Sequence, residues 1–182
     1  MTATTMLVNS SHPLPLGWEP DDLVNLWDIR PHHCLLRSRS LQLCACAAKA
    51  ANALFGQAER EGIKDFILAS AYRDGDYQAK LFEDSPNGYV AYPGCSEHQT
   101  GLAMDVAQFR RGMNLDDERK AWLAENCWEH GFVIRYPQGR QGVTGIPYEP
   151  WHLRYVGRDV AGEMRQRGWV LEEWREAHRE GR

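Results

Sequence analysis

Two histidines and one carboxylate are candidate metal ligands because their residue types bind metal ions and their neighbours place them on separate elements. His98 lies in a loop, and Asp105 follows seven residues later in the predicted strand 102–107. Met104 and Val106 flank Asp105, and a carboxylate in such apolar surroundings is costly unless it is paired or binds a metal. Taken alone, the segment fits equally well a buried aspartate that caps a turn.

The second histidine, His152, lies in an aromatic segment, Y-E-P-W-H-L-R-Y. Glu149 precedes it by three residues, and Pro150 between them excludes a regular helix. The two side chains therefore do not share one helical face, unlike the pair in H-E-x-x-H. They could serve as a metal ligand and a general base, or belong to an aromatic strand with a surface glutamate.

His98, Asp105 and His152 together form a plausible ligand set for one catalytic zinc ion. A water molecule at the fourth position of such a site has a pKa of about 7, and Glu149 could take its proton. Two histidines and a carboxylate also occur in Fe(II) oxygenases. Nothing else in the sequence suggests oxygen chemistry, so zinc is favoured.

Arg73 directly follows the predicted buried strand 65–71. An arginine at the end of such a strand suits a carboxylate or a developing oxyanion. The alternative is an ion pair with Asp74 or Asp76. Gln78 lies one turn into the next helix and could reach the same cleft, although an exposed helical glutamine is more common.

Composition excludes several classes of protein. The 182 residues include 21 Lys and Arg against 25 Asp and Glu, a formal charge of −4, whereas nucleic-acid-binding modules carry a basic excess. No stretch approaches the roughly 18 apolar residues of a membrane span, and we find no secretory signal. The five cysteines are irregularly spaced, which predicts free thiols and a cytoplasmic location. Cys95 has the chemistry of a zinc donor, but a packed loop thiol is favoured.

The elements that must position these residues form a mixture of helices and strands. We expect a single domain, 1–182, with an extended N-terminal arm over 1–33. The apolar spacing predicts helices over 43–62, 76–83, 116–130 and 170–179, strands over 65–71, 102–107, 132–136 and 148–156, and a Gly-rich loop over 137–147. The links are too irregular for repeated βαβ units. The predicted class is α+β with a small, mostly antiparallel sheet flanked by helices.

Four motifs, in order along the chain, carry a resemblance to a known family. They are S-A-Y-R at 70–73, S-x-H-x-x-G-x-A-x-D at 96–105, G-F-x-I-R-Y-P at 131–137 and E-P-W-H at 149–152. They resemble the signatures of the VanY-like D-alanyl-D-alanine carboxypeptidases, the zinc peptidases of family M15. Further similarity, for example N-S-S-H-P-L at 9–14 and W-V-L-E-E at 169–173, is to the soluble VanXY type.

The resemblance implies a role for each candidate residue and a fold for the chain. It implies zinc ligation by His98, Asp105 and His152, general base catalysis by Glu149, polarisation of the scissile carbonyl by Arg73, and substrate binding by Ser96, Gln78 and Trp151. It places the catalytic core at 65–157. The implied fold is of the hedgehog/D,D-peptidase type, in agreement with the class predicted from the pattern.

The implied substrates are the D-Ala-D-Ala dipeptide and peptidoglycan precursor pentapeptides. Their hydrolysis would remove the target of vancomycin, so the resemblance is compatible with a resistance role and equally with ordinary wall recycling or housekeeping trimming. An L,D-carboxypeptidase or an endolysin of the same fold is an alternative, although the acidic charge and the absence of a wall-binding module disfavour an endolysin. A zinc-bound, non-catalytic binding module is a third hypothesis, and the presence of Glu149 and Arg73 disfavours it.

Overall fold

A five-stranded sheet organises the computed structural model, which describes residues 3–85 and 90–179. Its strands in spatial order are β2 (Leu35–Leu36), β4 (Phe66–Ser70), β5 (Ala103–Gln108), β7 (Glu149–Tyr155) and β6 (Phe132–Tyr136). Only β2 and β4 pair in parallel, and the other neighbours are antiparallel. The predicted α+β class with a mostly antiparallel sheet is confirmed.

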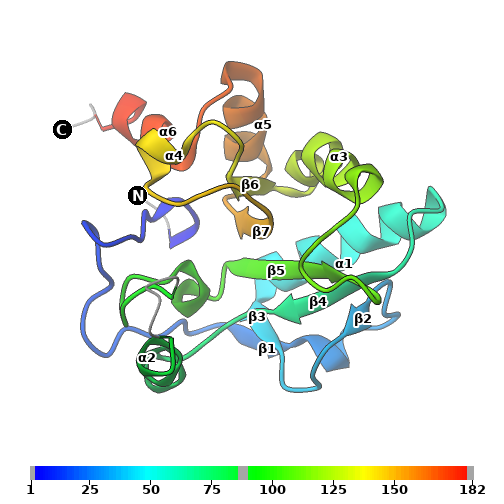
Figure 1. The fold of residues 1–182 in the computed structure, drawn as a ribbon, viewed down its shortest axis with the longest axis horizontal. Helices are drawn as coiled ribbons and strands as arrows, with labels where there is room; N and C mark the ends of the chain where they lie inside the picture. Colours follow the sequence, from blue (N-terminus) through cyan, green and yellow to red (C-terminus); the bar gives the residue numbers. More distant parts are fainter. Residues whose placement is uncertain (1–2, 86–89, 180–182) are drawn as a thin grey trace.

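Helices lie at both ends of the sheet and behind it (Figure 1). They are α1 (Ala45–Arg60), α2 (Gly75–Glu83), α3 (Asp117–Asn126), α4 (Gln141–Thr144), α5 (Arg158–Arg167) and α6 (Leu171–Ala177), with short 3-10 turns η1 (Ala3–Thr5), η2 (Leu26–Asp28), η3 (Glu97–Thr100) and η4 (Cys127–His130). In Figure 1, α5 and α6 lie together near β6 and β7, and α2 lies at the opposite end. None of the helices in the described ranges is long and apolar enough to cross a bilayer.

One face of the sheet packs on α1 to form the main core. Leu54 and Phe55 of α1 are fully buried in the same cluster as Met104 of β5 and Leu153 of β7. Because side chains alternate along a strand, Asp105 and His152 must point to the opposite face. The sheet therefore has an apolar face, which packs in the core, and a second face that bears the polar side chains of Asp105 and His152.

Several elements were not predicted. Within the arm 1–33, β1 (Leu23–Asn25) pairs with β3 (Gln42–Cys44) as a second, two-stranded sheet. The predicted loop 137–147 contains α4, α5 was missed, and the predicted helix 116–130 divides into α3 and η4. Strands of two or three residues are too short to show an alternation of apolar and polar side chains. Helix α5 was not predicted, although it buries the apolar residues Ala161 and Met164.

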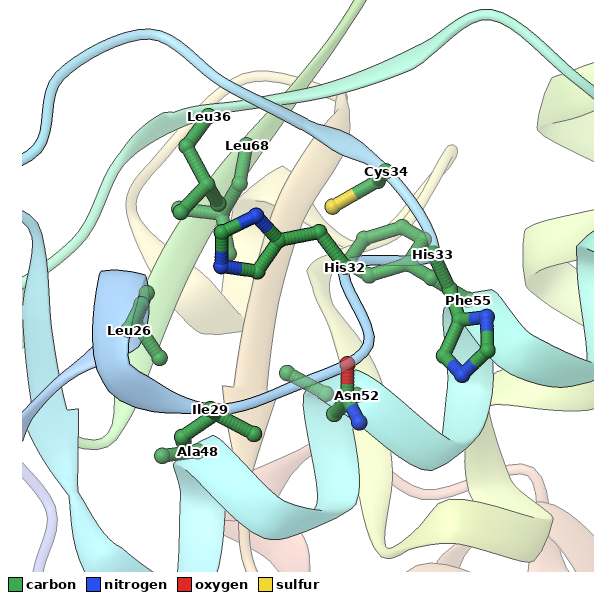
Figure 2. A pocket seen from close by; sticks show the side chains of 11 residues that line it. Leu26, Ile29, His32, His33, Cys34, Leu36, Ala48, Asn52, Phe55 and Leu68 are labelled. Atoms are coloured by element: carbon green, nitrogen blue, oxygen red, sulfur yellow. The ribbon is translucent and has the colours of Figure 1, made fainter.

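A pocket of about 20 Å³ lies between α1 and the chain that leads into β2, and Figure 2 shows its lining. Such a volume suits about one water molecule. His32 and His33 lie on it but are engaged elsewhere, since His32 donates Nε2–H to the Trp27 carbonyl and His33 Nδ1 lies 2.7 Å from Glu59 Oε2. The two histidines therefore have structural partners.

Candidate active site

Asp105 and His152 come together because β5 and β7 are adjacent antiparallel strands. The two residues are direct cross-strand partners, so their side chains lie on the same face of the sheet. Asp105 Oδ1 lies 2.9 Å from His152 Nδ1. Strand pairing alone thus places two candidate ligands side by side.

The short helix η3 delivers the third candidate ligand. His98 Nε2 lies 3.1 Å from Asp105 Oδ2, and its Nδ1–H donates to the Ala71 carbonyl at 2.7 Å. Gly101 ends η3 with a φ of 68°, and a Cβ at this position would lie 2.8 Å from Cys44 Sγ. Only glycine meets both demands, so the G in S-x-H-x-x-G fixes the position of His98.

The donor set fits a zinc ion. One ligand atom each from His98, Asp105 and His152 lies within 4.8 Å of the others, and no second such group of His, Cys, Asp or Glu occurs in residues 3–85 and 90–179. Two imidazoles and one carboxylate leave a fourth tetrahedral position open, as in catalytic zinc sites. The hydrogen bond from His98 Nδ1–H leaves the Nε2 lone pair for a metal.

The protonation states suit metal binding at two of the three ligands. Burial would raise the pKa of Asp105, but the neighbouring His98 and His152 hold it well below its usual range. Burial lowers the pKa of His98, which favours its neutral, metal-binding form. Burial would also lower the pKa of His152, but the carboxylates of Asp105 and Glu97 raise it to about 9. Metal binding must therefore displace a proton from His152.

The three ligands lie in a cleft of about 530 Å³. Its wall includes the predicted residues Ser96, Glu149 and Trp151, together with residues 8–11 of the N-terminal arm and 142–146 of the β6–β7 connection. Glu149 is half-buried, and burial raises its pKa, the direction that suits a general base near neutral pH. Cys95 also lines the cleft but is not part of the ligand cluster.

Arg73 points at the metal ligands. It donates from Nη2 to Asp105 Oδ2 at 3.3 Å and from Nε to Ser70 Oγ at 3.2 Å. A register shift between Leu68 and Ser70 places Ser70 opposite Asp105 and so on the same face. Within the described residues, Arg73 forms no ion pair with Asp74 or Asp76, the alternative that the sequence left open.

Gln78 lies behind Arg73 rather than in the wall of the cleft. Its side chain is fully buried, accepts a hydrogen bond from Arg73 Nη1 at 3.1 Å and donates to the Ala91 carbonyl at 2.8 Å. Gln78 is therefore placed to orient the guanidinium, and the structure gives it no direct opening to the cleft.

A buried ionic network at the site was not predicted from the sequence. Glu97 Oε1 lies 2.7 Å from Arg135 Nε and 3.1 Å from Arg154 Nη1, and Glu97 Oε2 lies 3.4 Å from His152 Nε2. All three charged side chains are fully buried. The sequence does place one arginine in each of two strands, Arg135 in β6 and Arg154 in β7. It does not indicate which carboxylate the two arginines pair with.

Comparison with known proteins agrees with the geometry. The VanY family model, D-alanyl-D-alanine carboxypeptidase, matches residues 40–158. The chain is 36% identical over 172 residues to a D-alanyl-D-alanine carboxypeptidase of Enterococcus faecium, covering 93% of this chain and 56% of that protein. It is 35% identical over 186 residues to the bifunctional D-Ala-D-Ala dipeptidase and carboxypeptidase VanXYC of Enterococcus gallinarum, covering 94% and 93%.

Solved structures show the same fold. The LdcB LD-carboxypeptidase superposes with a TM-score of 0.81 at 35% identity, covering 93% of this chain and 84% of that one. A variant of the D,D-pentapeptidase VanY from a VanB-type vancomycin-resistance cassette, in complex with Zn(II), superposes with a TM-score of 0.79 at 28% identity, covering 95% and 99%. The resemblance found in the motifs is thereby confirmed. This chain belongs to the VanY D-alanyl-D-alanine carboxypeptidase family.

Proposed function

We propose that this protein is a zinc-dependent D,D-peptidase that hydrolyses the D-Ala-D-Ala bond of the dipeptide, of peptidoglycan precursor pentapeptides, or of both. The observation that carries the proposal is the convergence of His98, Asp105 and His152 in a cleft that also holds Glu149 and Arg73. The similarity to VanXYC, which covers most of both chains, supports activity on both substrates.

His98, Asp105 and His152 would hold the zinc ion. When bound, zinc supplies the Lewis acidity that makes water a nucleophile near neutral pH. Glu149 takes the proton of the attacking water, because its raised pKa and its place in the cleft suit a general base. The same carboxyl group then delivers this proton to the leaving amine, so that Glu149 is regenerated in each cycle.

Arg73 stabilises the negative charge that develops on the carbonyl oxygen of the substrate. Its guanidinium is held by Ser70 and Gln78, so it needs little reorganisation when the charge appears. Ser96, almost fully buried in the wall of the cleft, binds the terminal carboxylate, and Trp151 shapes the pocket beside the metal.

The test is release of D-alanine by the purified protein from the D-Ala-D-Ala dipeptide and from a pentapeptide ending in D-Ala-D-Ala, each with and without a chelator. Chelator-sensitive release from both substrates supports a bifunctional D,D-peptidase. Release from one alone identifies a dipeptidase or a carboxypeptidase. A zinc-loaded protein that releases D-alanine from neither contradicts the proposal.

An L,D-carboxypeptidase is the second candidate, and its support is the similarity to LdcB at a TM-score of 0.81. The discriminating substrate is a stem peptide whose terminal D-alanine follows an L-residue. Faster turnover of this peptide than of the D-Ala-D-Ala pentapeptide would favour the L,D activity. The two peptides are compared at equal concentration, since kcat/KM sets the preference between competing substrates.

We further propose that the protein acts in the cytoplasm and that its activity lowers sensitivity to vancomycin. The five cysteines, all within the described residues, are free thiols, which supports a reducing compartment. Expression in a vancomycin-sensitive host should raise the inhibitory concentration, and Glu149→Gln should abolish the increase. Equal inhibitory concentrations for the two forms, at equal protein levels, would contradict the resistance role.

A further inference from the structure

Glu97 lies between a metal ligand and two arginines. It follows Ser96 in the sequence and precedes His98, and although it borders the cleft, its carboxylate has no exposed surface. One oxygen, Oε2, faces His152 Nε2 at 3.4 Å, and the other faces Arg135 and Arg154. A carboxylate without solvent must be stabilised by these neighbours alone.

The two ring nitrogens of His152 have different surroundings. Nδ1 lies 2.9 Å from Asp105 Oδ1 and therefore faces the metal cluster, whereas Nε2 faces Glu97. Tyr136 packs beside the imidazole with 5.0 Å between ring centroids, so the ring has little freedom to turn. A histidine that binds a metal through one nitrogen is oriented by the hydrogen bond that the other nitrogen donates.

We propose that Glu97 is a positioning residue that accepts the Nε2–H of His152 and so holds Nδ1 toward the metal. The proposal rests on the proposed zinc site, and it assigns to Glu97 a role that differs from those of the ligands and of the base. Glu97 is not one of the three clustered donors. It acts through the orientation of His152.

The two arginines make a buried carboxylate possible at this point. A buried ion pair is stable only when its geometry satisfies the remaining polar atoms. Arg135 meets this condition through Glu172 of α6, to which it donates from Nη1 at 2.9 Å and from Nη2 at 2.6 Å. The pair is bidentate, the strongest arrangement for arginine and a carboxylate.

Arg154 connects the same carboxylate to the N-terminal arm. Its Nη2 donates to the Met6 carbonyl at 2.8 Å and to the Thr4 carbonyl at 3.3 Å. The arm and α6, which are far apart in the sequence, therefore meet through the two arginines at Glu97. Both segments support the orientation of His152, although Glu172 lies outside the wall of the cleft.

The first test measures zinc affinity by chelator competition for Glu97→Met and Glu172→Gln. Methionine has a similar size but no oxygen that can accept the His152 Nε2–H, so Glu97→Met should weaken zinc binding about 10–100-fold, the usual effect of removing the partner of a ligating histidine. Glu172→Gln should weaken it less, because Arg135 remains. The matched control is Glu163→Gln, since Glu163 accepts from Trp174 Nε1 and joins α5 to α6 without reaching the site. Wild-type affinity in folded Glu97→Met would overturn the proposal.

The second test needs no variant, so the proposal can be overturned even if Glu97→Met fails to fold. Long-range ¹H–¹⁵N spectra of the zinc-loaded wild-type protein should show His152 bound to the metal through Nδ1 and protonated at Nε2. Metal binding through Nε2 would overturn the proposal. Neither test depends on peptide hydrolysis, so D-alanine release measured on the same samples separates failure of this role from failure of the proposed function.

Discussion

Asp105 of β5 and His152 of β7 are direct cross-strand partners, with 2.9 Å between Oδ1 and Nδ1. They are 47 residues apart in the sequence, and only the β5–β7 ladder makes them neighbours. Since the sheet also places Met104 and Leu153 in the core on its other face, the strands that hold the core fix the geometry of the site.

Glu149→Gln should retain zinc and lose activity. The residue lines the cleft but is not part of the ligand cluster, so the substitution removes a proton acceptor and leaves the three ligands in place. We expect kcat to fall about 10²–10⁴-fold, the usual contribution of a general base. Metal content and steady-state kinetics are measured on the same preparation. Near-normal turnover would show that Glu149 is not the base.

His152→Ala should lose zinc, because one of the three ligands is removed and Asp105 is left with a single histidine partner. Zinc content is measured after the protein has been loaded with zinc and dialysed against buffer without metal. His130→Ala is the matched control, since His130 Nε2 bonds with Gln57 at 2.7 Å and lies outside the cluster. Retention of stoichiometric zinc in His152→Ala would exclude His152 as a ligand.

Arg73→Lys should lower kcat more than it changes zinc content. Lysine keeps the charge but cannot bond at once with Ser70, Gln78 and Asp105, as the guanidinium does. Loss of one oxyanion donor lowers kcat about 10²–10³-fold. The comparison is with Arg111→Lys, whose exposed side chain is bonded only to the Asn114 carbonyl among the contacts described. Equal kcat in the two variants would remove Arg73 from the mechanism.

The acid limb of the pH–activity profile should have its midpoint above the ordinary pKa of glutamate. Burial raises the pKa of Glu149, and a base is active only when deprotonated. Activity is therefore full above the raised pKa and is lost as the pH falls through it. In kcat/KM, the midpoint of this limb should exceed about 4.3, the unperturbed value for glutamate. A midpoint at or below that value would contradict the assignment.

Gly101→Ala should destabilise the fold more than Gly112→Ala. Both glycines have positive φ, which costs an L-residue about 1–2 kcal/mol. Only Gly101 adds a clash, with Cys44 Sγ 2.8 Å from the new Cβ, whereas nothing lies within 4 Å at Gly112. Urea unfolding of the two variants measures the difference. Equal losses of unfolding free energy would show that the packing of η3 on Cys44 is loose.

The sequence predicted the strand that carries Asp105 because it is a short apolar run, and the strand that carries His152 because Pro150 excludes a helix from its aromatic segment. It also predicted the gathering of the three ligands, by residue type and by resemblance to a family. It did not predict the network of Glu97, Arg135, Arg154 and Glu172. These residues come from η3, β6, β7 and α6, and their approach depends on how those elements pack rather than on any local period.

The same limit explains the fate of Gln78. Its position on α2 left two interpretations open, a side chain that reaches the cleft or an exposed helical glutamine, but the structure buries it against Ala91 and Arg73. Helical periodicity gives the face of a side chain and not the segment that will cover it. The role of Gln78 in orienting Arg73 follows from its contacts in the folded chain, with Arg73 on one side and the Ala91 carbonyl on the other.

The central claim is that His98, Asp105 and His152 hold one zinc ion on which hydrolysis depends. The most direct measurement is D-alanine release from a D-Ala-D-Ala pentapeptide by protein stripped with a chelator and then titrated with zinc. The account predicts no release from the stripped protein and recovery that rises linearly to a maximum at one zinc per chain. Full activity in the stripped protein, or recovery that needs a different stoichiometry, would contradict it.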